Sequence, residues 1–328
     1  MVFRGTLGSG ARLIKFILKR VFWLVILLLG LSYACFAMVH LSKGSVVYAK
    51  APQGVSEELK KQIEANLNLD KPLNEQYLAW LSAAIKGDFS HSLITGESVN
   101  EIIAQRLGAT LILGGLSLFV LFALSLVFAL ISVMNKDKFI DKALNFISMG
   151  FFATPSFAIC LLLILFFSVY LGVLPSSNIA DLGFENDVLN RLTHLILPVS
   201  ALVLAHLGAY LRIFRTILLE SFNQNFIEAA FARGLSTKSI YFHLVLKHAL
   251  SPILVYFAAN SVAFLMNAYV VESVFAYGGL GNLVIESIIF KDYPVILAVV
   301  VLSIVGVVVL NFFAELCANL LDTRKIYA

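Results

Sequence analysis

Six uncharged apolar runs, each long enough to cross a lipid bilayer, constrain the fold of this chain more than any other feature of its sequence. A transmembrane helix needs about 20 apolar residues, and inside lipid the backbone polar groups must be satisfied within the span. We therefore expect an all-α integral membrane protein with six transmembrane helices, in the runs 21–42, 107–135, 143–180, 192–211, 248–271 and 293–314.

The basic residues of the short loops indicate how these helices are oriented. The third run, 143–180, could hold two crossings, but we interpret it as one crossing with an amphipathic lead-in, because splitting it would reverse the charge bias. With a cytoplasmic N-terminus, only Arg191 and Lys291 fall in short outer loops. The cytoplasmic side then holds Arg4, Arg12, Lys15, Lys19, Arg20, Lys136, Lys138, Lys142, Arg212, Arg215, Arg233, Lys238, Lys247, Arg324 and Lys325. The net charge of +4 follows from this bias, so no nucleic-acid partner is expected.

These assignments divide the chain into five parts. Residues 1–20 form a cytoplasmic N-terminus, the first transmembrane helix follows, and residues 43–105 form an extracytoplasmic insertion. Within the insertion we expect two helices, at 56–67 and 74–85, separated by a proline. The other five transmembrane helices form a membrane domain over residues 106–319, and residues 320–328 form a cytoplasmic C-terminus.

The segment 220–252 is a polar, basic insertion between the fourth and fifth apolar runs. It is too charged for lipid, and its first part predicts a short amphipathic helix capped by Asn223 or Asn225 and ended by Gly234. Glu228 and Arg233 lie off the apolar face of this helix. The face itself is formed by Phe226, Ile227, Ala230 and Phe231.

A second amphipathic piece follows, with Ser236 or Thr237 as its cap and Pro252 as its end. Its apolar positions are Ile240, Tyr241, Leu244 and Leu246. An apolar stripe exposed to the cytoplasm indicates a docking partner that covers it. The alternative is a loop that lies on the lipid surface.

A few polar groups and one proline interrupt the apolar runs. Pro155 predicts a kink in the third run, and Asn260, Asn267 and Glu272 place polar side chains in or at the end of the fifth. Polar groups at membrane depth tend to face a cavity or another subunit, so these four residues are candidates for lining a translocation path. The alternatives are a purely structural kink and hydrogen bonds between helices.

The sequence lacks several motifs of enzymatic and metal-binding chemistry. It has no phosphate-binding G-x-x-x-x-G-K-[ST] loop, no H-E-x-x-H and no G-x-S-x-G, so we expect no ATP hydrolysis by this chain, no cofactor and no metal site. Its six histidines show no metal-ligand spacing. We interpret His206, within the fourth run, as a hydrogen-bonded histidine and not as a metal ligand.

The sequence Glu228-Ala229-Ala230, followed after three residues by Gly234, resembles the EAA loop of permease subunits of bacterial ABC importers. Pro252 comes five residues later than in the general form, which resembles the dipeptide, oligopeptide and nickel branch of that family. Similar motifs occur in the family's order at residues 68–111, 151–157, 172–177, 194–198, 272–281, 291–294 and 321–325. One departure is the sequence of residues 41–45, where relatives commonly carry Pro-Gly-Asp-Pro.

This resemblance implies a permease subunit of an ATP-driven importer in the bacterial inner membrane. It implies that the loop docks on an ATPase through Glu228, Ala229, Ala230, Arg233 and Gly234. The implied partners are a second homologous permease, two cytoplasmic ATP-binding subunits, an extracytoplasmic substrate-binding protein and membrane lipid. The implied cargo is a di- or oligopeptide, and the alternative is nickel, as a chelate, or another small solute.

Two functions of other classes remain open from the residues alone. An intramembrane enzyme would need an acid, base or nucleophile pair at helical spacing within the runs, and the sequence offers none. In a passive channel, the segment 220–252 would have no function. Co-purification of ATPase chains separates a transporter subunit from both.

Overall fold

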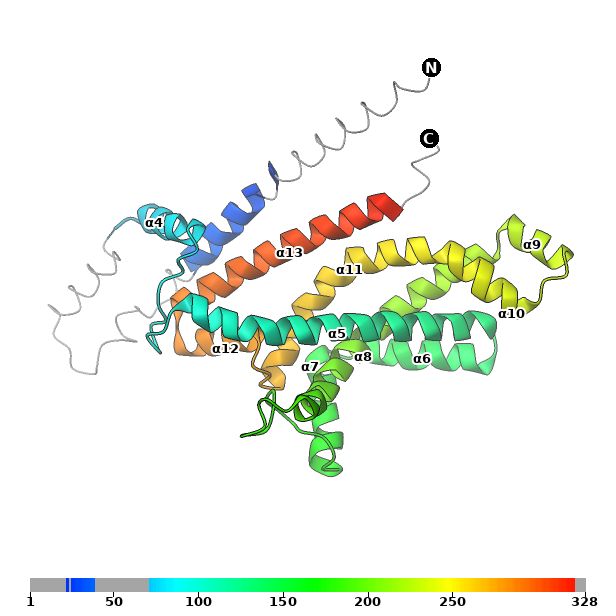
Figure 1. Cartoon of the computed structure of the whole chain (residues 1–328), viewed down its shortest axis with the longest axis horizontal. Helices are drawn as coiled ribbons and strands as arrows, with labels where there is room; N and C mark the ends of the chain where they lie inside the picture. The colour runs from blue at the N-terminus through cyan, green and yellow to red at the C-terminus, as the bar shows by residue number, and fades with distance from the viewer. Residues whose placement is uncertain (1–21, 24, 39–70, 322–328) are drawn as a thin grey trace, which may run out of the picture. The chain divides into compact units, whose positions relative to one another are not determined.

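The computed structural model describes residues 22, 23, 25–38 and 71–321, with side chains described as far as residue 312. Its regular elements are helices (Figure 1). After an apolar helix at Val25–Met38, they are α4 (Leu73–Ile85), α5 (Val99–Met134), α6 (Phe139–Ala153), α7 (Ser156–Leu163), the π-helical η1 (Ile164–Tyr170), α8 (Val188–Phe222), α9 (Asn225–Ala232), α10 (Thr237–Ser239), the π-helical η2 (Ile240–Val245), α11 (Leu246–Val274), α12 (Leu280–Phe290) and α13 (Tyr293–Leu321).

Four of the six predicted spans are confirmed as apolar helices long enough to cross a membrane. They are Val99–Met134, Val188–Phe222, Thr237–Val274 and Tyr293–Phe312. The helix Val25–Met38 lies within the first predicted span, whose other residues are mostly outside the described part of the chain. The predicted helix at 74–85 is confirmed as α4, whereas the one at 56–67 lies outside the described residues. Six crossings therefore stay a prediction.

The third predicted span is broken rather than continuous. The arm α6 and the arm formed by α7 and η1 meet at an angle of 104°. Pro155 lacks a backbone N–H and forces the preceding Thr154 into an extended conformation (φ −91°, ψ 131°), which ends α6. The Thr154 hydroxyl donates to the carbonyl of Gly150 over 2.9 Å and satisfies a group at the end of α6. The predicted kink at Pro155 is confirmed, whereas a single crossing with an amphipathic lead-in stays a prediction for this span.

Pro252 does not end the second amphipathic piece, contrary to expectation. The helical stretch Thr237–Val274 continues through it, with Pro252 inside α11. Ala249 and Ile253, on either side of the proline, are fully buried, so packing offsets the lost backbone hydrogen bond. The π-helical η2 directly before α11 is the kind of local adjustment that accommodates a proline within a membrane helix.

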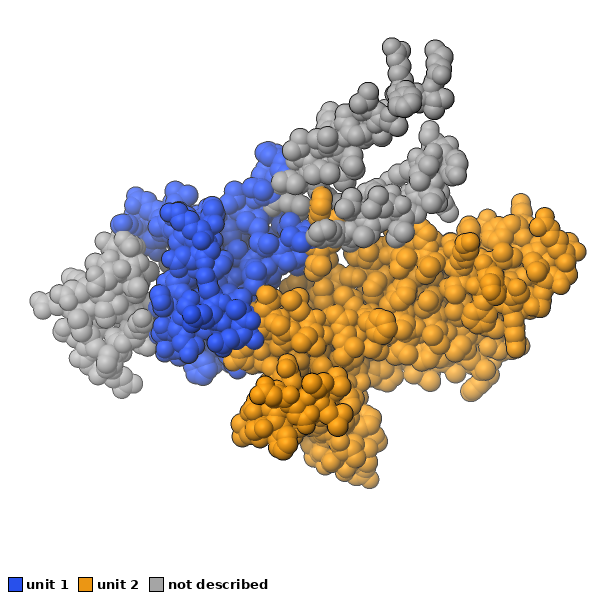
Figure 2. All heavy atoms as spheres, viewed as in Figure 1, with its two compact units in different colours: residues 1–105, 284–309 blue, residues 106–283, 310–328 orange. Residues whose placement is uncertain are grey.

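The chain divides into two compact units (Figure 2). One contains residues 1–105 and 284–309, and the other contains residues 106–283 and 310–328. In the first unit, Tyr77 of α4 packs with Phe36 and Leu297, and its hydroxyl lies 2.8 Å from the Ser32 hydroxyl. The same unit contains Asp292, whose carboxylate accepts hydrogen bonds from the Ser92 hydroxyl and from the backbone N–H of Leu93.

The second unit is built around α8. One face of this helix is buried along nearly its whole length, with at most 2% exposure at Leu197, Ala201, Leu202, Leu211, Phe214 and Leu218. The helices α6, α7 and α11 pack against α8. Because its apolar positions recur every three to four residues, α8 presents a continuous stripe to these neighbours.

At Gly208 the backbone of α8 lies directly against α6. A Cβ atom added there would lie 2.8 Å from the carbonyl carbon of Ser148 and 2.9 Å from Cβ of Phe152. Small residues allow such close backbone contact between membrane helices, where van der Waals packing holds neighbours together. The crossing of α6 and α8 therefore requires glycine at this position.

A polar cluster joins α5, α6 and α8 near the C-terminal end of α8. Asp141, which is 3% exposed, accepts two hydrogen bonds from Arg215, from Nε at 2.9 Å and from Nη2 at 2.7 Å. The same carboxylate also accepts from the Ser132 hydroxyl, the Asn145 amide and the backbone N–H of Asp137. A buried charge needs such a complete set of partners.

We predict that Gly208→Ala lowers the stability of the purified protein by about 1–3 kcal/mol, because the added methyl group overpacks the α6–α8 crossing. The measurement is thermal unfolding in detergent. Gly115→Ala is the matched control, since no atom lies within 4 Å of a Cβ at that position. Equal losses for the two variants would show that the crossing does not depend on Gly208.

Candidate functional site

The segment between α8 and α11 folds into the expected pair of short helical pieces. The first is α9, and its N-cap is Gln224, which makes no side-chain capping bond. The expected caps are therefore wrong by one position, because Asn223 ends α8 and Asn225 is already the first residue of α9. Without a capping side chain, the position of α9 depends on the packing of its buried face.

Gly234 ends α9, as predicted. Its φ of +78° lies in the left-handed region, and its backbone N–H bonds to the carbonyl of Phe231 over 2.9 Å. The backbone N–H of Leu235 bonds to the carbonyl of Ala230 over 3.2 Å. These two bonds form a Schellman motif, which satisfies helix-end carbonyls and uses glycine because an L side chain disfavours this conformation.

The second piece begins at the cap that the sequence predicts. The Ser236 hydroxyl accepts from the backbone N–H of Ser239 over 3.4 Å. Of the predicted apolar positions, Ile240 and Tyr241 are buried, whereas Leu244 and Leu246 are half-buried. The apolar side of this piece therefore turns into the second unit.

Burial separates the predicted docking residues into two sets. Ala230 is 5% exposed and Ile227 is 1% exposed, so this side of α9 packs inside the chain. The other four predicted residues are exposed, and they are Glu228, Ala229, Arg233 and Gly234. Neither Glu228 nor Arg233 has a hydrogen bond or ion pair with another described side chain. The four exposed residues are accessible to a partner, whereas Ala230 packs α9 against the rest of the chain.

Two aromatic contacts and one hydrogen bond fix the loop to the long helices. The Phe222 ring stacks on the Tyr241 ring, with centroids 5.1 Å apart and planes 11° apart. Ser221 Oγ and His248 Nδ1 are hydrogen-bonded at 3.0 Å, and the His248 ring lies 5.2 Å from Phe226. Phe222, Ser221 and His248 were not predicted from the sequence, and the only signal for them is their position near the end of α8 and the start of α11. We name residues 221–248 the docking loop.

The docking loop also carries exposed apolar side chains. Phe226 is 40% exposed, Phe231 is 43% exposed and Leu235 is 43% exposed. The expectation that Phe226 and Phe231 lie near the buried face with Ile227 is met only in part, since both rings reach the surface. Ala229, Glu228 and Arg233 are exposed on the same short segment.

The four predicted path residues make no hydrogen bonds with one another in the part of the chain that the structure describes. Pro155 lies at the break between α6 and α7, and Asn260 donates to the carbonyl of Tyr256 on its own helix over 2.9 Å. Asn267 donates to Nε2 of His206 over 3.2 Å. His206 Nδ1 donates to the carbonyl of Leu202 over 3.0 Å, so both ring nitrogens have partners.

Glu272 lies at the end of α11 and is fully buried. Its Oε2 accepts from the backbone N–H of Gly281 over 2.7 Å. A Cβ at Gly279 would run into this carboxylate, and a Cβ at Gly281 would lie 2.8 Å from Cβ of Tyr269. This geometry favours a structural role for Glu272, which fixes the glycine-containing turn between α11 and α12.

Among the described residues, no group of three or more His, Cys, Asp or Glu side chains could hold a metal ion. The docking loop exposes one acidic and one basic side chain, Glu228 and Arg233, together with several apolar side chains. Its other face is locked into the core of the second unit.

Two family models match most of the chain. Residues 122–327 match the family model of the binding-protein-dependent transport system inner membrane component, and residues 13–114 match the model of that family's N-terminal part. An oligopeptide transport system permease protein of Bacillus subtilis is 32% identical over 313 residues, which cover 95% of this chain and 99% of that protein.

Two further similar proteins have names that denote other cargoes. A metal-staphylopine import system permease protein of Staphylococcus aureus is 30% identical over 314 residues, covering 94% of this chain and 97% of that protein. A methionine ABC transporter solved in an inward-facing conformation is similar in fold, with a TM-score of 0.54 at 18% identity over 67% of this chain and 96% of that chain. The chain thus belongs to the family of inner membrane components of binding-protein-dependent transport systems, as the permease component of an ABC transporter and not its ATPase.

Proposed function

We propose that this chain forms half of the translocation path of an ATP-driven importer for di- or oligopeptides. Relatives whose names denote oligopeptide, dipeptide or other peptide permeases support this cargo. A metal chelate, such as a nickel chelate, is the second candidate, because the metal-staphylopine permease is 30% identical, close to the 32% of the oligopeptide permease. Uptake assays with labelled tripeptide and with radioactive nickel separate the two.

We further propose that the chain crosses the membrane six times, with both termini and the docking loop in the cytoplasm. The clustering of Lys and Arg near this loop supports that orientation. The helix α8 has 35 residues and is about 50 Å long, which exceeds the roughly 40–45 Å of a bilayer with its headgroups. Its C-terminal end, and the docking loop with it, would therefore project beyond the lipid.

The docking loop is the proposed contact with a cytoplasmic ATPase. One observation carries this proposal: α9 exposes Glu228, Ala229 and Arg233 while Ile227 and Ala230 on its other side are locked into the core. A partner that pulls on the exposed face would move α8 and α11 with it, because the Phe222–Tyr241 stack joins the loop to both. Rigid-body movement of this kind is a common way to transmit a conformational change.

The complete transporter would then contain a second homologous permease, two ATP-binding subunits and an extracytoplasmic substrate-binding protein. The family description, which specifies binding-protein dependence, supports the last of these. An intramembrane enzyme or a channel would not bring down ATPase chains. Purification of the tagged chain from membranes, followed by identification of the co-purified proteins, tests the proposal against both.

We predict that Gly234→Val abolishes uptake while the protein remains in the membrane. No atom lies within 4 Å of a Cβ at Gly234, so the effect arises from the backbone conformation and not from a clash. A left-handed conformation costs an L residue about 1–2 kcal/mol, and a β-branched residue adopts it least readily.

The measurement is uptake of labelled tripeptide per amount of membrane-inserted protein. Gly234→Asn is the matched control, because asparagine tolerates the left-handed conformation, and it should retain most of the uptake. If valine and asparagine at this position gave the same uptake, the Schellman turn would have no part in coupling.

We predict opposite effects for substitutions at two adjacent alanines of α9. Ala229→Leu should leave thermal stability unchanged but reduce ATPase co-purification at least tenfold, because Ala229 is exposed on the proposed contact face. Ala230→Leu should lower stability by about 1–3 kcal/mol, since Ala230 is 5% exposed within the core. Wild-type ATPase binding by the Ala229 variant would argue against this face as the contact.

A further inference from the structure

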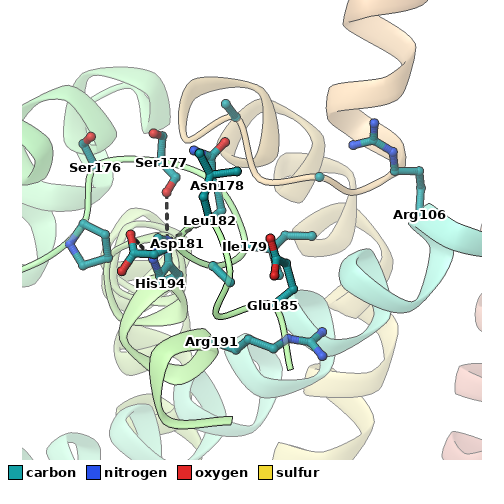
Figure 3. Close-up of a pocket in the computed structure, with 14 residues that line it drawn as sticks. Arg106, Ser176, Ser177, Asn178, Ile179, Asp181, Leu182, Glu185, Arg191 and His194 are labelled. Carbon is teal, nitrogen blue, oxygen red and sulfur yellow. Dashed lines mark hydrogen bonds and ion pairs between the residues drawn. The ribbon is translucent and has the colours of Figure 1, made fainter. Parts of the chain in front are cut away.

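An open cavity of about 860 Å³ lies beside the N-terminal end of α8 (Figure 3). It is lined by the start of α8, by residues of the segment 175–185 before it and by the turn after α11. Two hydrogen bonds fix these walls, from the backbone N–H of Asn178 to the carbonyl of Phe275 at 3.0 Å and from His194 Nδ1 to the carbonyl of Ser177 at 2.8 Å. Sequence reasoning missed this cavity.

Two arginines from different helices reach the cavity. Arg106 comes from α5 and Arg191 from α8 (Figure 3). Both are half-buried, and neither guanidinium group has a hydrogen bond or ion pair with a described residue. The Arg106 guanidinium passes close to Gly278, where an added Cβ would lie 2.8 Å from Nη1. Guanidinium groups in such positions match the geometry of a carboxylate, which accepts two parallel hydrogen bonds.

The acidic residues of the cavity differ in their availability. Asp181 is engaged, because its Oδ2 accepts from the Asn190 amide over 2.7 Å and its Oδ1 lies 3.4 Å from His194 Nε2. Glu185 is exposed and accepts one hydrogen bond, from the backbone N–H of Gly183 over 3.0 Å. That hydrogen bond lowers the pKa of the Glu185 carboxyl, so the group is ionised at neutral pH.

We propose that this cavity binds a small zwitterion, with its carboxylate at Arg106 or at Arg191 and its ammonium group at Glu185, which lies between the two arginines in Figure 3. A short peptide with free ends has this charge pattern. The volume of about 860 Å³ lies within the range of ordinary ligand sites, about 300–1,000 Å³. The assignment of a peptide as the natural ligand rests on the proposed function, whereas the charge pattern is independent of it.

The position of the cavity agrees with an entry site. It lies at the N-terminal end of α8 and the docking loop at its C-terminal end, about 50 Å apart for 35 residues. If the docking loop is cytoplasmic, the cavity opens on the outer side, where cargo arrives. A small ligand fits this concave site better than a protein surface does, and acidic side chains of a binding protein are the competing occupant.

The test is direct binding of labelled trialanine to the purified transporter in lipid nanodiscs, without ATP and without binding protein. We expect saturable binding that is weakened about tenfold or more by Arg106→Gln or by Arg191→Gln, and by replacing trialanine with its C-terminal amide. Glu185→Gln should weaken trialanine binding but leave the affinity for N-acetyl-trialanine unchanged.

Lys86→Gln is the control, because it removes one positive charge at an exposed position that does not line the cavity. It should bind trialanine as the wild type does. Co-purification of the ATPase subunits with each variant verifies that the transporter assembles. Loss of the ATPase subunits would count against the proposed function, whereas loss of trialanine binding alone would concern the cavity. Should the Arg106 variant fail to assemble, the comparison of trialanine with its amide on the wild type decides alone.

Three outcomes would overturn the proposal. The first is no saturable trialanine binding by an assembled wild-type transporter. The second is equal affinity for trialanine and its amide. The third is an unchanged trialanine affinity in the Arg106 and Arg191 variants together with weaker docking of the binding protein, which would assign the arginines to that protein's acidic side chains.

Discussion

The packing of α8 is the constraint on which the rest of the second unit depends. This helix spans 35 residues, about 50 Å, whereas the hydrocarbon core of a bilayer is about 30 Å thick. Its buried stripe holds α6, α7 and α11, and its two ends carry the cavity and the docking loop. Because one rigid element joins both features, a displacement at either end has a direct route to the other.

The cluster around Asp141 and Arg215 gives this helix a polar attachment to α5 and α6. Breaking a buried ion pair by removing one partner costs about 3–5 kcal/mol, because the other charge stays buried without compensation. Arg215 lies two turns before the end of α8, close in sequence to the stacked pair of Phe222 and Tyr241. Movement of the docking loop would therefore be shared with α5 and α6.

The features that could be predicted from the sequence are those set by local composition. The apolar runs locate the long helices, Gly234 ends α9 because glycine adopts the left-handed conformation at no steric cost, and Ser236 caps the next piece. The kink at Pro155 is also predicted by local sequence, whereas the angle of 104° between the two arms is not. These predictions need no knowledge of distant neighbours.

The features that could not be predicted depend on contacts distant in sequence. The helix α11 continues through Pro252 because Ala249 and Ile253 are buried against other elements. This packing outweighs the tendency of proline to end a helix. The pairing of Asp141 with Arg215 joins residues 74 positions apart. The cavity likewise combines α5, α8 and two connecting segments, and no motif marks its two arginines.

The most direct test of the account is the sidedness of the two ends of α8, measured by labelling with a membrane-impermeant thiol reagent. In a variant without Cys35, Cys160 and Cys317, single cysteines would replace Lys238 in the docking loop and Leu182, which is 95% exposed, beside the cavity. The account predicts that Leu182→Cys is labelled in cells with an intact inner membrane, and that Lys238→Cys is labelled only after this membrane is permeabilised. Labelling of Lys238→Cys with the inner membrane intact would contradict it.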